Sequence, residues 1–328
     1  MPKPWVAALG SLKGWLITAG IWGAVIGIYF VVTASNWERS RVHLDASLAE
    51  VIRCDVPVET VVGPFTDMDD AADDYDRAVQ EYNGTDRYSG YFALAAEKAI
   101  EPDMLNIRAP QYLLSGACKG RMNYARRFAQ VGDWTGYPVG YVKAFDAIGQ
   151  ICVLKADVLL RAGRTEEAEA LLKAVVAFGY HVEQERVRYS QTVTGVALQK
   201  RACRMLLQVY KQTDQTARAE TVEEYIKALQ MLQDKLEGKA SSTIARLEDA
   251  SPPAGVMFWL VDNDKDRMWQ IEGILMLGLT QWTAPRAADQ RASRERLTAL
   301  AQHATEPMLN DAAKAALGFT REDVHKVR

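Results

Sequence analysis

The sequence is short of the side chains that build most metal and redox centres. It has four histidines in 328 residues, and no two of them lie at metal-ligand spacing on one helix. The four cysteines form no C-x-x-C pair, which removes the zinc, thioredoxin-type and haem-attachment motifs. The histidines are His43, His181, His303 and His325, and the cysteines are Cys54, Cys118, Cys152 and Cys203.

The signatures of common enzyme classes are also missing. The chain contains no H-E-x-x-H, no phosphate-binding loop, no G-x-G-x-x-G and no G-x-S-x-G. Spacing leaves open one nucleophilic pair, a cysteine with His181. We therefore predict that the protein is not an enzyme, with no catalytic residue and no cofactor.

Two acidic stretches have the alternating oxygens of a calcium loop without its other requirements. Asp262, Asp264 and Asp266 alternate, but Arg267 and Gly273 stand where the loop needs glycine and glutamate. We interpret the stretch as a polar turn that caps a helix from about Arg267, and we predict no metal site. The other stretch lacks the bend glycine and is interpreted as an acidic helix start; it holds Asp67, Asp69, Asp70, Asp73, Asp74 and Asp76.

Charge of one sign is not in excess, since 39 basic and 42 acidic residues give a net charge of −3. A nucleic-acid surface needs clustered lysine and arginine, so we expect no nucleic-acid partner. Runs rich in β-branched residues are scarce, the best being 59–63. The composition therefore favours an all-α fold.

One long hydrophobic run is present, at residues 15–34. It has twenty residues and no charge, and a helix of about twenty residues spans the roughly 30 Å of a bilayer core. Trp5, Trp15 and Trp37 mark its ends, as membrane interfaces favour. The rival interpretation is a cleavable signal ending at 32–34, but signal cores are usually about 7–15 residues long. We predict a retained, single-pass anchor after a tail at 1–14.

Small residues follow one face of this predicted span. Ala19, Gly23 and Gly27 are four apart, and such stripes let a second membrane helix approach closely. We predict contacts with lipid and a second transmembrane helix along this stripe. Because a short tail precedes a long domain, we expect that domain on the extracytoplasmic side.

The rest of the sequence predicts helices that are separated by turns. We expect a juxtamembrane linker at 35–66, a helical domain at 67–237, a linker at 238–253 and a second helical domain at 254–328. Thr66 or Asp67 is a candidate cap for the first helix of the domain. The predicted helices cover 67–82, 88–100, 109–130, 141–162, 165–178, 187–211 and 215–236.

The hairpin at about 145–180 resembles a tetratricopeptide-type repeat. Gly163 allows a tight turn and Thr165 a cap, although the usual proline near the end is replaced by Gly179 and Tyr180. The resemblance implies two antiparallel helices that stack and bind protein partners. Its residues are Ala156, Leu159, Gly163, Ala168 and Leu172.

The last seventy residues contain an internal echo at an offset of forty. The pattern that starts at Met268 and ends Leu277-Gly278-x-Thr280 recurs from Met308 to Thr320. The echo covers about 262–320 and looks like HEAT-type repeats, which implies stacked helix pairs that complete one another's core.

Together these features favour a membrane-anchored helical-repeat scaffold, an accessory subunit that binds proteins in a membrane-associated complex. The alternative is a membrane-tethered enzyme or ligand-binding domain whose site is assembled from dispersed residues. The cysteines are interpreted as four buried thiols rather than two disulfides. The aromatic side chains that could line such a site are Tyr82, Tyr88, Tyr91, Tyr112, Trp134 and Tyr137.

Overall fold

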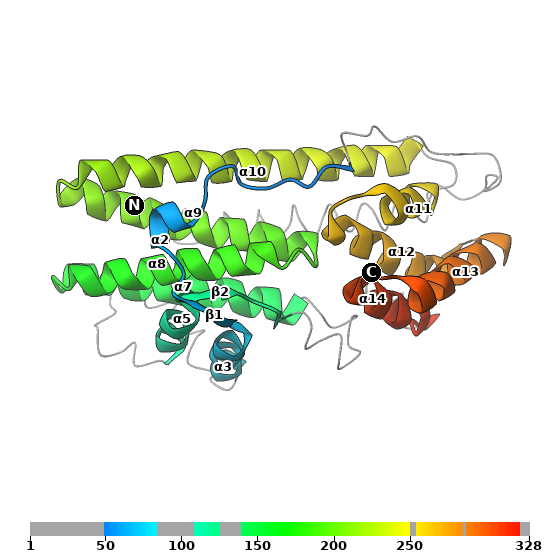
Figure 1. Ribbon diagram of the computed structural model, residues 1–328, viewed down its shortest axis with the longest axis horizontal. Helices are drawn as coiled ribbons and strands as arrows, with labels where there is room; N and C mark the ends of the chain where they lie inside the picture. The colour runs from blue at the N-terminus through cyan, green and yellow to red at the C-terminus, as the bar shows by residue number, and fades with distance from the viewer. Residues whose placement is uncertain (1–48, 84–107, 125–138, 250–253, 285–286, 322–328) are drawn as a thin grey trace, which may run out of the picture. The chain divides into compact units, whose positions relative to one another are not determined.

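The computed structural model describes residues 49–83, 108–124, 139–249, 254–284 and 287–321 (Figure 1). Within these ranges the chain forms eleven helices and two short strands, so the prediction of an all-α fold is confirmed. No helix in these ranges is long and apolar enough to cross a bilayer. The predicted span at 15–34 lies outside the described residues, as does the predicted helix at 88–100.

The chain divides into two compact units. The central unit comprises 53–127 and 136–235, and the C-terminal unit comprises 1–52, 128–135 and 236–328. In the described part of the chain, the C-terminal unit therefore includes residues 49–52 from far upstream in the sequence.

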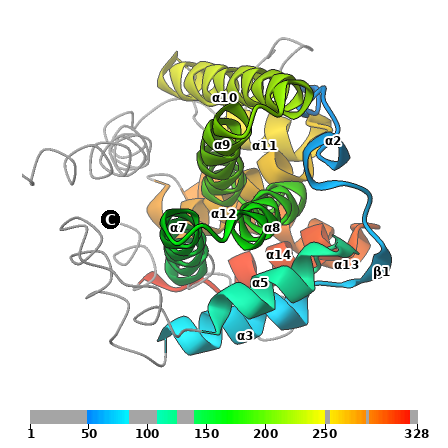
Figure 2. The ribbon, with the colours of Figure 1, turned by 90° about the vertical axis from the view of Figure 1, so that its left-hand side faces the viewer.

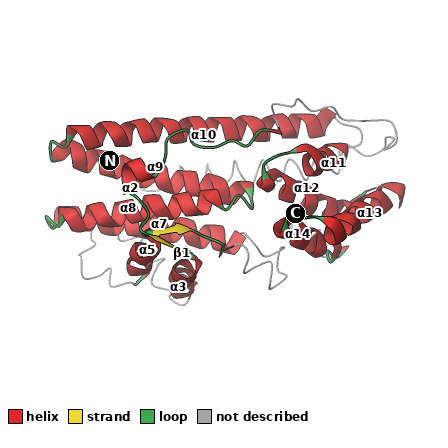
Figure 3. Ribbon diagram, viewed as in Figure 1, coloured by secondary structure: helices red, strands yellow, loops and turns green. Residues whose placement is uncertain are grey.

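The central unit contains a short parallel strand pair. β1 and β2 join through the pairs Asp67–Lys119 and Asp70–Arg121 (Figure 3). In sequence, helices lie before, between and after these two strands. The elements are α2 (Glu59–Val62), β1 (Asp67–Asp70), α3 (Ala72–Asn83), α5 (Ala109–Ala117), β2 (Lys119–Arg121), α7 (Val139–Arg161), α8 (Thr165–Gln184), α9 (Tyr189–Gln212) and the first part of α10 (Thr216–Asp249).

The acidic stretch at 67–82 is therefore not one helix, and the predicted cap at Thr66 or Asp67 is wrong. Asp67 accepts a hydrogen bond from the N–H of Asp69, and Asp70 accepts one from the N–H of Ala72. These short side chains satisfy backbone donors in an extended segment, which competes with helix. The helix starts at Ala72 with acidic residues in its first turn, so that part of the interpretation holds.

The predicted hairpin at 141–162 and 165–178 is present as α7 and α8. Gly163 turns the chain with a φ of +74°, which glycine adopts without strain. The cap position is Arg164 rather than Thr165, and α8 continues to Gln184, past the predicted end at 178. Four of the residues that carry the repeat resemblance are buried, namely Ala156, Leu159, Ala168 and Leu172.

Two glycines set the close crossing of α8 and α9, seen end-on in Figure 2. A Cβ on Gly195 would lie 2.5 Å from the carbonyl oxygen of Gly179, and one on Gly179 would lie 2.7 Å from that of Gly195. The two backbones are therefore in contact. Around this crossing the core is aromatic, with Phe178 edge-on to Phe145 and Tyr75.

The C-terminal unit contains the second part of α10 and four further helices. The first part of the predicted linker at 238–253 is helical, because α10 continues through Gly238 to Asp249. One face of this extension is buried, through Leu236, Lys239 and Thr243, and burial stabilises a helix that a glycine weakens. The other elements are α11 (Ala254–Asn263), α12 (Arg267–Thr283), α13 (Ala287–His303) and α14 (Pro307–Leu317).

The echo at an offset of forty corresponds to two helices that touch. α12 follows its cap at Asp266 and α14 follows its cap at Glu306. A Cβ on Gly278 would lie 2.8 Å from that of Ala316, so α12 and α14 cross at the echoed glycine. The fold of this unit is repeat-like at the level of helical hairpins.

Candidate functional site

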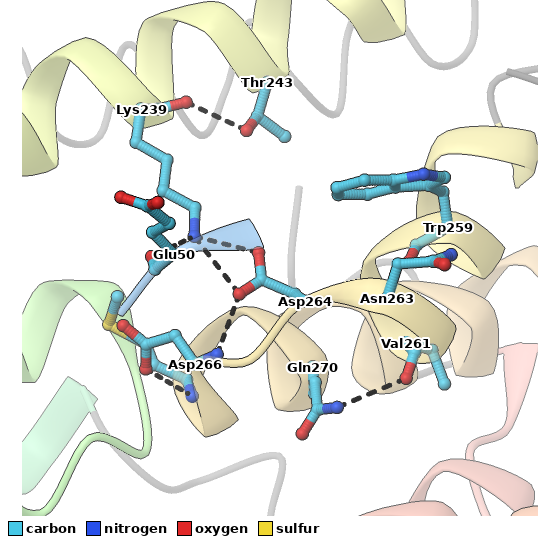
Figure 4. A network of polar contacts seen from close by, with 10 residues as sticks. Glu50, Lys239, Thr243, Trp259, Val261, Asn263, Asp264, Asp266 and Gln270 are labelled. Atoms are coloured by element: carbon cyan, nitrogen blue, oxygen red, sulfur yellow. Dashed lines mark hydrogen bonds and ion pairs between the residues drawn. The ribbon is translucent and has the colours of Figure 1, made fainter. Parts of the chain in front are cut away.

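A cluster of buried charges lies in the C-terminal unit around Lys239 of α10 (Figure 4). Its Nζ lies 2.9 and 3.1 Å from the two carboxylate oxygens of Asp264, in the turn between α11 and α12. It also donates to the carbonyl oxygen of Glu50 at 3.3 Å. The side chains of Lys239 and Asp264 are 3% and 0% exposed, so the pair is removed from water.

The neighbouring backbone is tied into this cluster. Asp264 accepts the N–H of Asp266 at 2.8 Å, and Asp266 accepts the N–H of Met268 at 3.2 Å as the cap of α12. The interpretation of 262–266 as a capping turn is thereby confirmed. Asp264 directs its oxygens at a lysine and an amide rather than at an ion position, and the described ranges contain no group of three potential metal ligands.

The chemistry of this cluster is that of a paired charge. Burial raises the pKa of the Asp264 carboxyl, while Lys239 and the Asp266 amide act in the opposite direction. Nζ of Lys239 lies 5.4 Å from the ring centre of Trp269, a second favourable contact for the cation. With its ammonium protons directed to Asp264 and Glu50, Lys239 offers no lone pair for nucleophilic attack.

The second polar cluster lies in the central unit around His181 of α8. Its Nδ1 is 2.8 Å from the hydroxyl of Tyr75 on α3, and its ring is 5.3 Å from that of Phe65. The histidine is 1% exposed, and burial lowers its pKa to about 4. At neutral pH the pair is therefore an uncharged imidazole beside a protonated phenol, whose own pKa burial also raises.

The cysteine and histidine that could form a nucleophilic pair are engaged elsewhere. Cys118 is exposed at the end of α5 and donates to the carbonyl of Ser115 at 3.1 Å, while His181 bonds Tyr75. Burial raises the pKa of the Cys152 and Cys203 thiols, which keeps them protonated. All four cysteines are free thiols; Cys152 and Cys203 are buried as predicted, whereas Cys54 is half-buried and Cys118 is exposed.

The remaining predicted site residues are dispersed. The membrane-packing residues Ala19, Gly23 and Gly27 lie outside the described residues. Of the aromatic side chains proposed to line a pocket, Tyr82 and Tyr112 are half-buried. The others lie outside the described residues, namely Tyr88, Tyr91, Trp134 and Tyr137.

No family model, curated protein or solved structure matches the chain. The resemblances to tetratricopeptide and HEAT repeats therefore stay predictions from the residues that carry them.

Proposed function

We propose that the protein is a single-pass membrane scaffold or accessory subunit, whose helical hairpins bind protein partners in a membrane-associated complex. The observation that carries this proposal is the succession of antiparallel helices in each unit. In the central unit, α9 and α10 are joined by Tyr225 and Lys200, which bond Gln199 and Gln233 across the hairpin. In the C-terminal unit, α13 lies between α12 and α14 in sequence, and Gln281 near the C-terminal end of α12 donates to the carbonyl of Ala316 near the C-terminal end of α14 at 2.8 Å.

Such hairpins stack into extended surfaces, which is how tetratricopeptide and HEAT-type arrays bind proteins. The Lys239 cluster supports the same interpretation, because its charged groups bond one another and the neighbouring backbone. The uncharged run at 15–34 supplies the anchor, and the stripe of Ala19, Gly23 and Gly27 supplies a surface for another membrane helix. In this proposal the helical units lie on the extracytoplasmic side.

The anchor and its orientation can be tested with a native thiol. Cys118 is the exposed cysteine of the four. We expect the protein to stay in the membrane pellet after an alkaline carbonate wash. We also expect a membrane-impermeant maleimide added to intact cells or spheroplasts to label it. A Cys118→Ser variant is the control. Release by carbonate would overturn the anchor, and labelling only after lysis would place the units in the cytoplasm.

The scaffold role can be tested by cross-linking mass spectrometry in native membranes. We expect cross-links from the helical units to a small, reproducible set of proteins, which co-purify in detergent at constant stoichiometry. A Gly23→Leu/Gly27→Leu variant should weaken this association if the stripe packs on a partner helix, while Val25→Leu on the opposite face should not. A monodisperse monomer without cross-linked partners would contradict the proposal.

A further inference from the structure

The buried pair of Tyr75 and His181 joins two parts of the central unit. Tyr75 lies on α3, directly after β1, and His181 lies on α8, 106 residues later. The ring of Phe65, just before β1, lies 5.3 Å from the imidazole, and Tyr75 packs edge-on against Phe178 of α8 at 4.6 Å. This contact between the β1–α3 segment and α8 is named the His181 joint below.

The hydrogen bond of the joint satisfies both partners only while the histidine is neutral. In the described part of the chain the Tyr75 hydroxyl bonds Nδ1 of His181 at 2.8 Å, and Tyr75 is 0% exposed. An unprotonated Nδ1 accepts the hydroxyl proton, whereas both ring nitrogens of an imidazolium are donors. After protonation the hydroxyl can therefore only accept, and its own buried proton loses its acceptor, which costs free energy.

The carboxylates that act electrostatically on the joint are bonded to other donors. They are Asp70 of β1 and Asp74 of α3. Asp74 pairs with Nζ of Lys119 on β2 at 2.8 Å, and Asp70 accepts the N–H of Asn123 at 3.0 Å. An imidazolium in the joint would gain either carboxylate as a counter-ion only at the expense of these bonds.

The other elements packed on α8 supply no counter-ion from their described residues. α5 and residues 190–199 of α9 contain no charged side chain, Lys143 of α7 is a cation, and Glu59 of α2 is exposed. Glu183 of α8 faces α9, since a Cβ on Gly195 would lie 2.8 Å from its own Cβ. The remaining titratable groups on these elements are phenols and a thiol, which carry no charge in acid, namely Tyr112, Tyr180 and Cys118.

Water can reach His181 while most of the unit stays packed. Polar bonds hold β1 and α3 to β2, through the ion pair just described and through the N–H of Ala71, which donates to the carbonyl of Arg121 at 3.0 Å. On its other side α8 meets α9 at the backbone contact of Gly179 and Gly195, where no charge takes part. Movement of β1, β2 and α3 away from α8 therefore hydrates the imidazole and leaves both sets of contacts intact.

We propose that the His181 joint is an acid-sensitive switch, in which proton uptake by His181 moves β1, β2 and α3 off α8 while α8 and α9 stay packed. The driving force is hydration of the imidazolium, so the segment need not be loosely held at neutral pH. Burial lowers the pKa of His181 from 6.5 to about 4, although the Lys119 backbone and Asp70 act in the opposite direction. The open form therefore binds the proton first as the pH falls, and its ratio to the closed form should rise up to about 100-fold between pH 7 and 4.5.

Oxidative footprinting by mass spectrometry can follow the joint side chain by side chain. The full-length protein in detergent is exposed briefly to hydroxyl radicals at pH 7 and at pH 4.5. Tyr75 reports on the joint, and Tyr225 of α10, a buried phenol that bonds Gln199 of α9, reports on the rest of the unit. We expect oxidation of Tyr75 to rise at least about 10-fold at pH 4.5 while that of Tyr225 stays unchanged. An equal rise at both tyrosines, or no rise at Tyr75, would overturn the switch.

Two histidine variants test the sensor. His181→Gln removes the titration and keeps an acceptor for the Tyr75 hydroxyl, so Tyr75 oxidation should be the same at pH 4.5 and pH 7. His303→Gln removes an exposed histidine at the end of α13, in the other unit, and should keep the full response. A full response in His181→Gln would refute His181 as the sensor.

A second measurement covers the case in which His181→Gln does not fold. Deuterium exchange at the imidazole C2–H of His181 in the unaltered protein reports its titration, and the rise in Tyr75 oxidation has to follow that titration. A rise at a different pH would refute the sensor. Carbonate extraction and Cys118 labelling test the anchor separately, so failure of the switch and failure of the proposed function give different results.

Discussion

Each unit contains a buried polar pair, and the two pairs differ in charge. The central unit buries a neutral pair, Tyr75 and His181, and the C-terminal unit buries a charged pair, Lys239 and Asp264. A neutral hydrogen-bonded pair loses little on leaving water, whereas two charges lose much and recover it only from each other. The first pair should therefore be sensitive to pH and the second to loss of one partner.

The sequence offers a way to observe the units separately. All eight tryptophans lie outside 53–127 and 136–235, the ranges of the central unit. A change in tryptophan fluorescence therefore does not come from a tryptophan of the central unit, and Trp259, Trp269 and Trp282 lie in α11 and α12 of the C-terminal unit. Amide exchange in α8 and α9 reports on the central unit.

The largest effect should come from Lys239→Met. It leaves the carboxylate of Asp264 buried without its cation, and breaking such a pair typically costs about 3–5 kcal/mol. We expect the urea midpoint by tryptophan fluorescence to fall accordingly, with exchange in α8 and α9 little changed.

The control for this variant is Lys235→Met, which removes the same charge from an exposed pair on the same helix. Its cost should be below about 1 kcal/mol. Equal losses from the two variants would show that the buried pair has no special role in the C-terminal unit.

The second effect is acid destabilisation of the central unit through His181. Its pKa is lowered to about 4 in the folded protein from 6.5 when unfolded, so the unfolded state binds a proton first as the pH falls. The part of the unfolding free energy that the neutral His181 contributes is complete above pH 6.5, declines as the pH falls from 6.5 to 4, and is lost below pH 4. The total is roughly 3 kcal/mol, from about 1.4 kcal/mol per pKa unit.

A His181→Gln variant removes the titration and keeps a polar partner for the Tyr75 hydroxyl. Urea denaturation followed by exchange in α8 and α9 should then depend less on pH between 6.5 and 4. An unaltered pH dependence in the variant would assign the acid sensitivity to other groups. The neutral pair of the central unit would then not be the pH-sensitive one.

The third prediction concerns the helix crossing in the central unit. In Gly195→Ala the new methyl group would meet two backbone atoms, the Gly179 oxygen at 2.5 Å and the Glu183 nitrogen at 2.6 Å. Neither can rotate away, so α8 and α9 must separate, at a cost of about 1–3 kcal/mol. Thermal unfolding followed by circular dichroism should detect the loss, while tryptophan fluorescence in urea stays near the unaltered curve. A neutral or stabilising effect would show that the crossing tolerates a wider spacing.

The sequence predicted the helical fold, the turn at Gly163 and the contact between the echoed helices because each leaves a local trace. Periodicity marks an apolar face, and Gly163 marks a change of direction that few other residues allow. The polar clusters leave no such trace. Tyr75 and His181 are 106 residues apart, and Glu50 and Lys239 are 189 apart, so only the folded chain brings them together.

The C-terminal unit also shows where a local signal misled. Gly238 and the serines that follow it favour a break, yet α10 runs through them. Leu236, Lys239 and Thr243 are spaced as one face of a helix. Their sequence does not predict that this face is buried, because lysine is seldom a buried residue. Burial of that face stabilises the helix more than the glycine weakens it.

The smallest effect follows from that balance. Gly238 is exposed and nothing lies within 4 Å of where its Cβ would be, so a methyl group meets no obstacle. Alanine is about 1 kcal/mol more favourable than glycine inside a helix. Gly238→Ala should therefore raise the urea midpoint by tryptophan fluorescence by up to that amount, the opposite sign to Gly195→Ala although the substitution is the same. Destabilisation would mean that the chain uses a bend at this position, and that the break predicted at 238 describes a conformation of the protein better than a continuous α10 does.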